Sequence, residues 1–150
     1  MKINPNEYEV YDAKDEVLGR LSTKIAKALL NNKKVAVVNA KYAVISGDIS
    51  YFIKKYQTRL DLQEKENPEH SPYWSRRPDL LVKRVIRGML PYRYPRGKAA
   101  FRNLKVFINV PEEFKDSQII KVSAKNPHLL YTKFIYIKDL SERLGYKTKV

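Results

Sequence analysis

Cysteine is absent from the 150 residues, which excludes a disulfide framework, a thiolate metal site and a cysteine nucleophile. The five glycines form neither a G-x-G-x-x-G pattern nor a Walker-type phosphate loop, and the two histidines stand apart. Apolar runs such as Val35–Val38 are far too short to span a bilayer, and the polar, acidic N-terminus does not resemble a signal peptide. We therefore expect a soluble intracellular protein with no metal, cofactor or small-molecule substrate, outside the membrane.

Acidic residues are nearly missing from one stretch, Ser71–Pro111. It contains ten Lys or Arg residues against a single acid, Asp79, and so carries +9 of the formal net charge of +14. An ordinary solvated surface mixes charges of both signs. A local field of one sign instead attracts a polyanion, and nucleic acid is the commonest one in cells.

The first third of the sequence has the pattern of an α/β protein. The length fits one domain, and an apolar content of 43% is enough for a core. Apolar residues three and four apart predict a helix over about Val17–Leu30, and Val35–Val38 reads as a strand buried on both faces. Short strands are expected at Glu9–Asp12 and Tyr42–Ile45, before a helix that starts near Ile49. This order favours crossover connections in a sheet.

A helix from Pro78 to about Leu90 occupies the middle of the basic stretch. A helical-wheel projection of this segment predicts one apolar half and one cationic half. The apolar half holds Leu81, Val82, Val85, Ile86, Met89 and Leu90, and the cationic half holds Lys83, Arg84 and Arg87. We expect a basic aromatic loop at Tyr92–Arg96, then a helical turn or two at Lys98–Asn103 and a strand at Lys105–Val110.

Two parts of the chain are less regular. Residues 58–76 lack periodicity and are expected to form a long surface excursion. Trp74, beside Arg76 and Arg77, could stack on unpaired bases; with equal weight, it could anchor the excursion to the core. Within residues 112–150, the expectations are strands or extended segments at Ile119–Ile120 and Phe134–Ile137, and a short helix over Asp139–Gly145.

RNA is the favoured partner over DNA because no helix-turn-helix, zinc or zipper pattern is present, and because the cations come from loops and several elements. The charge pattern nominates as RNA contacts Lys24, Arg76, Arg77, Lys83, Arg84, Arg93, Arg96 and Arg102, with Tyr73, Trp74, Tyr92 and Tyr94 as candidates for base stacking. Two alternatives are a nucleic-acid-processing enzyme that uses an acid such as Asp12 or Asp48, and a membrane-surface protein. The cluster Asp12, Asp15 and Glu16 lies at a predicted helix start, where the helix dipole stabilises acids.

Three blocks of sequence carry a recognisable pattern. The first runs from Ile86-Arg-Gly-Met-Leu-Pro91 through Gly97-Lys98 to Leu104-Lys-Val-Phe107 and Asn109, with five-residue gaps before Gly97 and before Leu104. The others are Asp12 with Val17–Leu21, and Val35–Ala40 with Ala43–Gly47. Together these blocks resemble the L-thirteen family of large-subunit ribosomal proteins. The segment 56–77, and an ending without a long basic extension, favour an archaeal-type member.

This resemblance implies a three-layer α/β/α fold around a four-stranded, mainly parallel sheet. It also implies a cytoplasmic, non-enzymatic constituent of the large ribosomal subunit that binds rRNA, contacts neighbouring ribosomal proteins, acts early in subunit assembly and supports translation. The family motif carries the rRNA-binding role onto Arg20, Arg87, Gly88, Gly97 and Lys98 of this sequence.

Overall fold

The computed structural model describes residues 5–115, 117–122 and 133–147, so part of the C-terminal segment predicted over 112–150 lies outside the described residues. The strands are β1 (Tyr8–Asp12), β2 (Lys34–Val38), β3 (Val44–Ser46), β4 (Leu104–Val106), β5 (Ile119–Ile120) and β6 (Phe134–Tyr136). The α-helices are α1 (Leu18–Leu30), α2 (Ile49–Asp61), α3 (Pro78–Gly88), α4 (Pro95–Arg102) and α5 (Ile137–Arg143). Short 3-10 helices are η1 (Pro5–Glu7), η2 (Ala40–Tyr42), η3 (Pro68–His70) and η4 (Glu112–Phe114).

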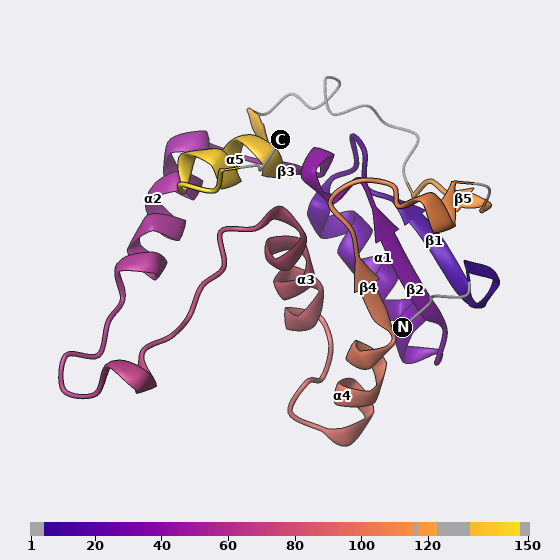
Figure 1. The fold of residues 1–150 in the computed structure, drawn as a ribbon, viewed down its shortest axis with the longest axis horizontal. Helices are drawn as coiled ribbons and strands as arrows, with labels where there is room; N and C mark the ends of the chain where they lie inside the picture. The colour runs from indigo at the N-terminus through magenta and orange to yellow at the C-terminus, as the bar shows by residue number, and fades with distance from the viewer. Residues whose placement is uncertain (1–4, 116, 123–132, 148–150) are drawn as a thin grey trace.

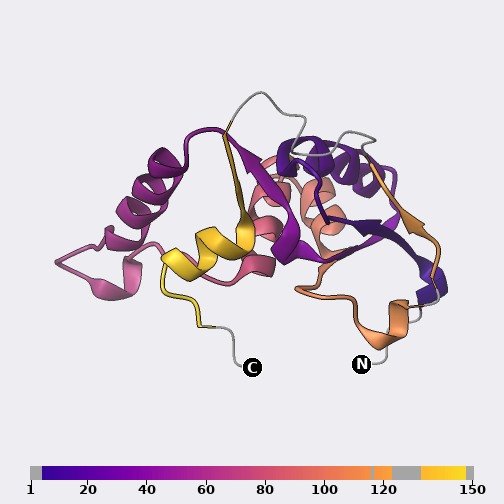
Figure 2. The same ribbon diagram turned by 90° about the horizontal axis from the view of Figure 1, so that it is seen from above.

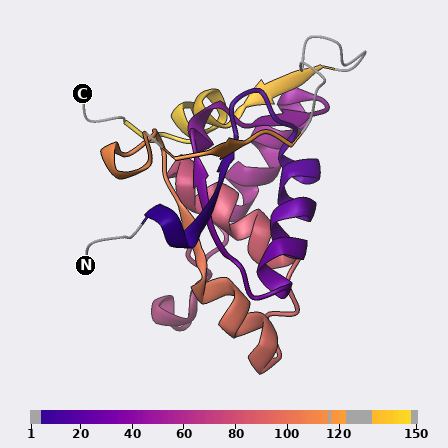
Figure 3. The same cartoon turned by 90° about the vertical axis from the view of Figure 1, so that its right-hand side faces the viewer.

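A four-stranded parallel sheet in the order β4-β2-β1-β5 forms the centre of the fold. Its side chains alternate between two faces, as the pleat requires. Val35 and Val37 of β2 belong to the core cluster beside α1, whereas Ala36 and Val38 belong to the cluster around Phe114 of η4. Figure 3 shows α1 on one side of the sheet and the orange segment with η4 on the other. The predicted α/β fold with a four-stranded parallel sheet is confirmed.

Helices α1, α3 and α4 pack together on one side of this sheet. The apolar stripe of α1 includes Leu21 and Ile25, and both side chains are fully buried. They share one core cluster with Leu81, Val82, Ile86 and Leu90 from α3 and the turn after it. Because these apolar side chains point inward, the cationic half of α3 is left on the outside of the layer.

A second, two-stranded sheet joins distant parts of the chain. Strands β3 and β6 pair antiparallel, from Val44 opposite Tyr136 to Ser46 opposite Phe134. Helix α5 follows β6, and its Leu140 packs in a cluster that also includes Ile49, Ile53 and Tyr56 of α2. Figures 1 and 2 show that α2 and α5 lie beside the main sheet rather than over it.

Several element boundaries differ from the sequence-based expectations. Helix α2 continues to Asp61, into the segment expected to be irregular. Helix α4 begins at Pro95 rather than Lys98, because proline at the first helical position has its φ angle already set for a helix. Strand β4 ends at Val106, well before Val110. Helix α5 starts at Ile137, two residues before the expected Asp139.

The apolar half of α3 is narrower than its wheel predicts. Met89 is 40% exposed, and Val85 is only half-buried. Met89 lies just beyond the last helical residue, where its Sδ is 3.7 Å from the Thr23 hydroxyl of α1. The prediction that Met89 packs in the core is therefore wrong, and Ile86 is the side chain at the centre of the buried face.

Gly97, in the first turn of α4, packs closely against the segment that joins α3 to α4. A Cβ at this position would overlap the Pro91 carbonyl and would lie 2.9 Å from the Tyr92 amide nitrogen. Gly88, at the end of α3, is the opposite case, because no atom beyond its chain neighbours and the backbone of its own helix lies within 4 Å of where its Cβ would be.

We predict that Gly97→Ala lowers the free energy of unfolding by about 1–3 kcal/mol, the usual range for overpacking. Gly88→Ala is the matched control and should leave stability unchanged or slightly raised, since alanine is the better helix former. Urea denaturation followed by circular dichroism measures both. Equal stability of the two variants would contradict the close packing of this turn.

Candidate nucleic-acid interface

The candidate RNA contacts lie on four neighbouring segments: α1, the loop that precedes α3, α3 itself, and α4 together with the turn that leads into it. Most of their side chains are exposed. The exposed residues are Arg20, Lys24, Arg76, Arg77, Gly88, Arg93, Arg96, Lys98 and Arg102; Lys83, Arg84 and Arg87 are half-buried, and Gly97 is buried. The structure thus gathers cations from between Arg20 and Arg102 of the sequence onto neighbouring helices and the loop before α3.

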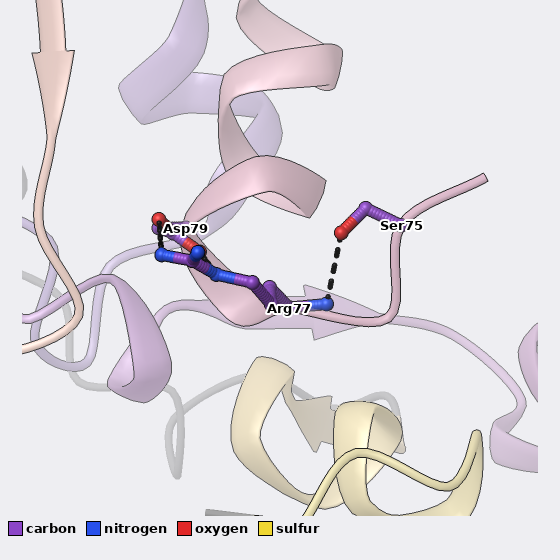
Figure 4. A network of polar contacts seen from close by, with 3 residues as sticks. All are labelled: Ser75, Arg77 and Asp79. Atoms are coloured by element: carbon purple, nitrogen blue, oxygen red, sulfur yellow. Dashed lines mark hydrogen bonds and ion pairs between the residues drawn. The ribbon is translucent and has the colours of Figure 1, made fainter. Parts of the chain in front are cut away.

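The start of α3 is fixed by an arginine–carboxylate pair (Figure 4). The Arg77 guanidinium donates to both oxygens of Asp79, with Nε–Oδ1 at 3.2 Å and Nη2–Oδ2 at 2.8 Å. The Arg77 backbone amide donates to the Ser75 hydroxyl at 3.2 Å. Asp79 lies in the first turn of the helix, where a negative charge also meets the favourable end of the helix dipole. Arg77 is therefore an exposed cation whose orientation is set by its own chain.

Trp74 connects the surface excursion to two helices. Its half-buried ring meets the Tyr56 ring edge to face, with centroids 6.5 Å apart. The guanidinium carbon of Arg84 is 3.5 Å from the ring centroid, and that of Arg59 is 4.5 Å away. Arg84 also donates from Nη1 to the Tyr73 carbonyl at 3.0 Å. These contacts support the anchoring role for Trp74.

The side chains of Lys83 and Arg84, on α3, are half-buried. Burial lowers the pKa of Lys83, the nearby charge of Lys105 lowers it further, and Asp79 acts in the opposite direction. Burial also lowers the pKa of Arg84, and the charges of Arg87 and Arg59 add to the effect. Crowded cations of this kind are stabilised when an anion binds among them.

The other candidate cations differ in whether the protein itself supplies a hydrogen-bond partner for their side chains. Lys24 donates to the Val122 carbonyl at 2.8 Å, and Arg96 donates to the Leu30 carbonyl at 3.4 Å, at the C-terminal end of α1. The structure records no side-chain hydrogen bond or ion pair within the described residues for Arg20, Arg76, Arg93, Lys98 or Arg102. These five are the cations most available to an external partner.

The four aromatic candidates fall into two pairs. Tyr73 is 85% exposed and Tyr94 is 69% exposed, so both rings face solvent. Tyr92 meets Phe101 of α4 edge to face at 5.3 Å, and the Arg87 guanidinium lies 5.2 Å from its centroid. The ring of Tyr92, like that of Trp74, therefore packs against side chains of the protein itself.

The acids suggested for an enzymatic alternative have structural partners. Asp12, at the end of β1, accepts hydrogen bonds from the Lys14 amide at 3.0 Å and from Asn39 Nδ2 at 2.9 Å. Asp48 caps α2 by accepting from the Tyr51 amide. Glu16 is buried and accepts from the Val122 amide at 3.1 Å. Asp12, Asp15 and Glu16 all precede α1, whose first turn contains no acid.

Arg59 is the residue near this surface that the charge pattern missed. It lies on α2, outside the basic stretch, in a segment that acids follow at Asp61 and Glu64, and no local signal in the sequence singles it out. The fold alone brings it to Arg84 and Trp74.

Comparison with known proteins places this sequence in a family. The sequence model described as Ribosomal protein L13 matches residues 6–113. The chain belongs to the ribosomal protein L13 family. The "Large ribosomal subunit protein uL13" of Archaeoglobus fulgidus is 39% identical over 150 residues, which covers 95% of this chain and 90% of the relative. Those of Methanococcoides burtonii and Sulfurisphaera tokodaii are each 40% identical, covering 92% and 91% of this chain and 98% and 93% of the relatives.

Family membership confirms the resemblance found in the three sequence blocks, and the relatives named above are archaeal, as the archaeal-type resemblance implied. The blocks converge in space, because α1, α3 and α4 pack as one layer on the sheet that contains β2 and β4. Across the described residues, no helix is long and apolar enough to cross a membrane. Within the same residues, no group of three or more His, Cys, Asp or Glu side chains is arranged to hold a metal ion.

We predict that Trp74→Ala loosens the excursion before α3, because it removes the ring on which Arg59 and Arg84 rest. The half-buried ring should contribute about 1–2 kcal/mol to the free energy of unfolding. Limited proteolysis should cut the variant within residues 62–77 faster than the parent protein. Tyr73→Ala is the control and should change neither property, and equal sensitivity of both variants would argue against the anchor.

Proposed function

We propose that this protein is a structural constituent of the large ribosomal subunit in the cytoplasm, binds large-subunit rRNA through the surface of α1, α3 and α4, and has no enzymatic activity. The observation that carries the proposal is the local charge of +9 in Ser71–Pro111, displayed on a folded layer of helices. The names of the relatives, each a large ribosomal subunit protein, support the same assignment.

Phosphate contacts explain this surface better than base recognition does. Its cations come from helices and turns of different direction, and no single element presents a row of amide or carboxylate groups for reading base edges. Arginine and lysine neutralise phosphates wherever a folded RNA brings its backbone close. The exposed rings of Tyr73 and Tyr94 add candidates for stacking on unpaired bases. The protein would thus recognise the shape of a folded RNA and hold its segments together during subunit assembly, beside neighbouring ribosomal proteins.

The open glycine at the end of α3 fits a close approach of RNA. Gly88 is exposed, and its absent side chain leaves open space beside Arg87. A glycine in a helix costs about 0.5–1 kcal/mol relative to alanine. No packing partner in the described chain requires it, so a backbone of RNA lying against this position supplies a physical reason for it.

Co-sedimentation tests the assignment to the ribosome. The tagged protein, expressed in an archaeal host, should sediment with large subunits at moderate salt and leave them only when rRNA contacts are disrupted. Recovery of the protein only in the soluble fraction would contradict the proposal.

Charge reversal tests the RNA-binding surface. We predict that Arg93→Glu combined with Lys98→Glu weakens binding to large-subunit rRNA about 100-fold at low salt, because each charge-assisted contact contributes about 1.5 kcal/mol or more. Both side chains are exposed and have no partner within the described chain, so the thermal unfolding temperature should be unchanged. Filter binding over a range of salt concentrations measures the affinity.

The matched control is Lys14→Glu combined with Lys54→Glu, which changes the net charge equally but lies outside the basic stretch. It should weaken binding far less. Equal losses in the two double variants would mean that net charge alone, rather than this surface, determines the affinity.

A further inference from the structure

A cleft of about 370 Å³ lies between α2 and α3. Its walls include Tyr56 and Arg59 from α2, Trp74 from the excursion, and Arg84 and Arg87 from α3. Two of these arginines are in the basic stretch, whereas Arg59 reaches the cleft from a helix of mixed charge.

Three arginines line this cleft without a carboxylate among the lining residues. The described chain records no ion pair for any of the three, although it forms such pairs elsewhere, for example between Arg77 and Asp79. The positive charges interact with one another, because Arg87 and Arg59 add to the effect of burial in lowering the pKa of Arg84. Burial raises the pKa of Tyr56, and the charges of Arg59 and Arg84 oppose that rise. Such a cluster is unfavourable in isolation and becomes favourable when an anion lies in the middle.

The arginines are also held in place before any ligand arrives. The Trp74 ring lies against the guanidinium groups of Arg59 and Arg84, and the Tyr73 carbonyl accepts one N–H group of Arg84. The ring of Tyr92 lies 5.2 Å from the guanidinium carbon of Arg87. A guanidinium has five donors, so most of them remain free after these contacts. Fixed planar forks of this kind match the oxygens of a phosphate.

The chemistry of the cleft favours a phosphate over a nucleobase. The indole face that a base would need already carries guanidinium groups, at 3.5 and 4.5 Å from its centroid. The lining residues instead supply positive charge and N–H donors without a carboxylate to balance them. Gly88 lies at the rim, where the missing side chain leaves room for a backbone to enter.

We propose that Arg59, Arg84 and Arg87 form a phosphate-binding site for the rRNA backbone in the cleft between α2 and α3. This inference rests on the proposed function and extends the RNA surface from α3 onto α2. It assigns to Arg59 a direct contact that the basic stretch alone would not suggest.

The test compares Arg59→Gln with Lys54→Gln, a control on the same helix that removes the same charge from an exposed position outside the cleft. Filter binding of the full chain to large-subunit rRNA is measured between low and moderate salt. We expect Arg59→Gln to weaken binding about tenfold and to reduce the salt-dependence slope by about 0.7–0.9, the share of one phosphate. Lys54→Gln should change the affinity less than about twofold.

Arg59→Lys keeps the charge and the aliphatic stem but loses the planar fork, and it also serves if the glutamine variant does not fold. We expect it to bind several-fold more weakly than the parent protein, and parent-like affinity would overturn the site. Equal losses for Arg59→Gln and Lys54→Gln would also overturn it, in favour of a diffuse field. Unchanged rRNA affinity with poorer incorporation into subunits would overturn it too, in favour of an acidic protein segment in the cleft.

The parent protein distinguishes failure of this phosphate site from failure of the proposed function. If the site is wrong but the function is right, the parent protein still binds rRNA and sediments with large subunits. If the function is wrong, the parent protein itself does neither.

Discussion

Burial of the apolar face of α3 is the constraint on which the interface depends. Leu81, Val82, Ile86 and Leu90 are nearly or fully buried against α1 and the sheet. At about 1.5–3 kcal/mol for each buried side chain, this packing is worth up to roughly 6–12 kcal/mol. Repulsion between two cations one helical turn apart costs about 0.7 kcal/mol in water and about 3 kcal/mol near a protein surface. Packing therefore dominates, and the helix keeps its cations on the outer face.

The surroundings of α3 convert that row of cations into a shaped surface. The Arg77–Asp79 pair fixes the start of the helix, and the close contact at Gly97 fixes the direction in which α4 departs. On the other side, Trp74 brings the excursion and α2 against Arg84. Each of these contacts positions a charge that would otherwise be mobile, so less conformational entropy would be lost in the RNA binding that we propose.

Periodicity predicted the elements that form the core, because α1 and β2 bury continuous stripes that are visible in the sequence. Boundaries were less predictable: proline allowed α4 to start three residues early, and the wheel could not show that α3 ends at Gly88, before Met89. The site was predictable where cations cluster along the chain. Arg59 was not, because its role depends on contacts with Trp74 and Arg84 that only the tertiary fold creates.

The central claim is that the outer face of α3 and α4, with the cleft beside α2, lies against rRNA. The most direct measurement is a cryo-electron-microscopy structure of the large subunit that contains this chain. We expect rRNA backbone along this face, with a phosphate within hydrogen-bond distance of Arg59, Arg84 or Arg87. The same face open to solvent, or covered by protein alone, would contradict the claim.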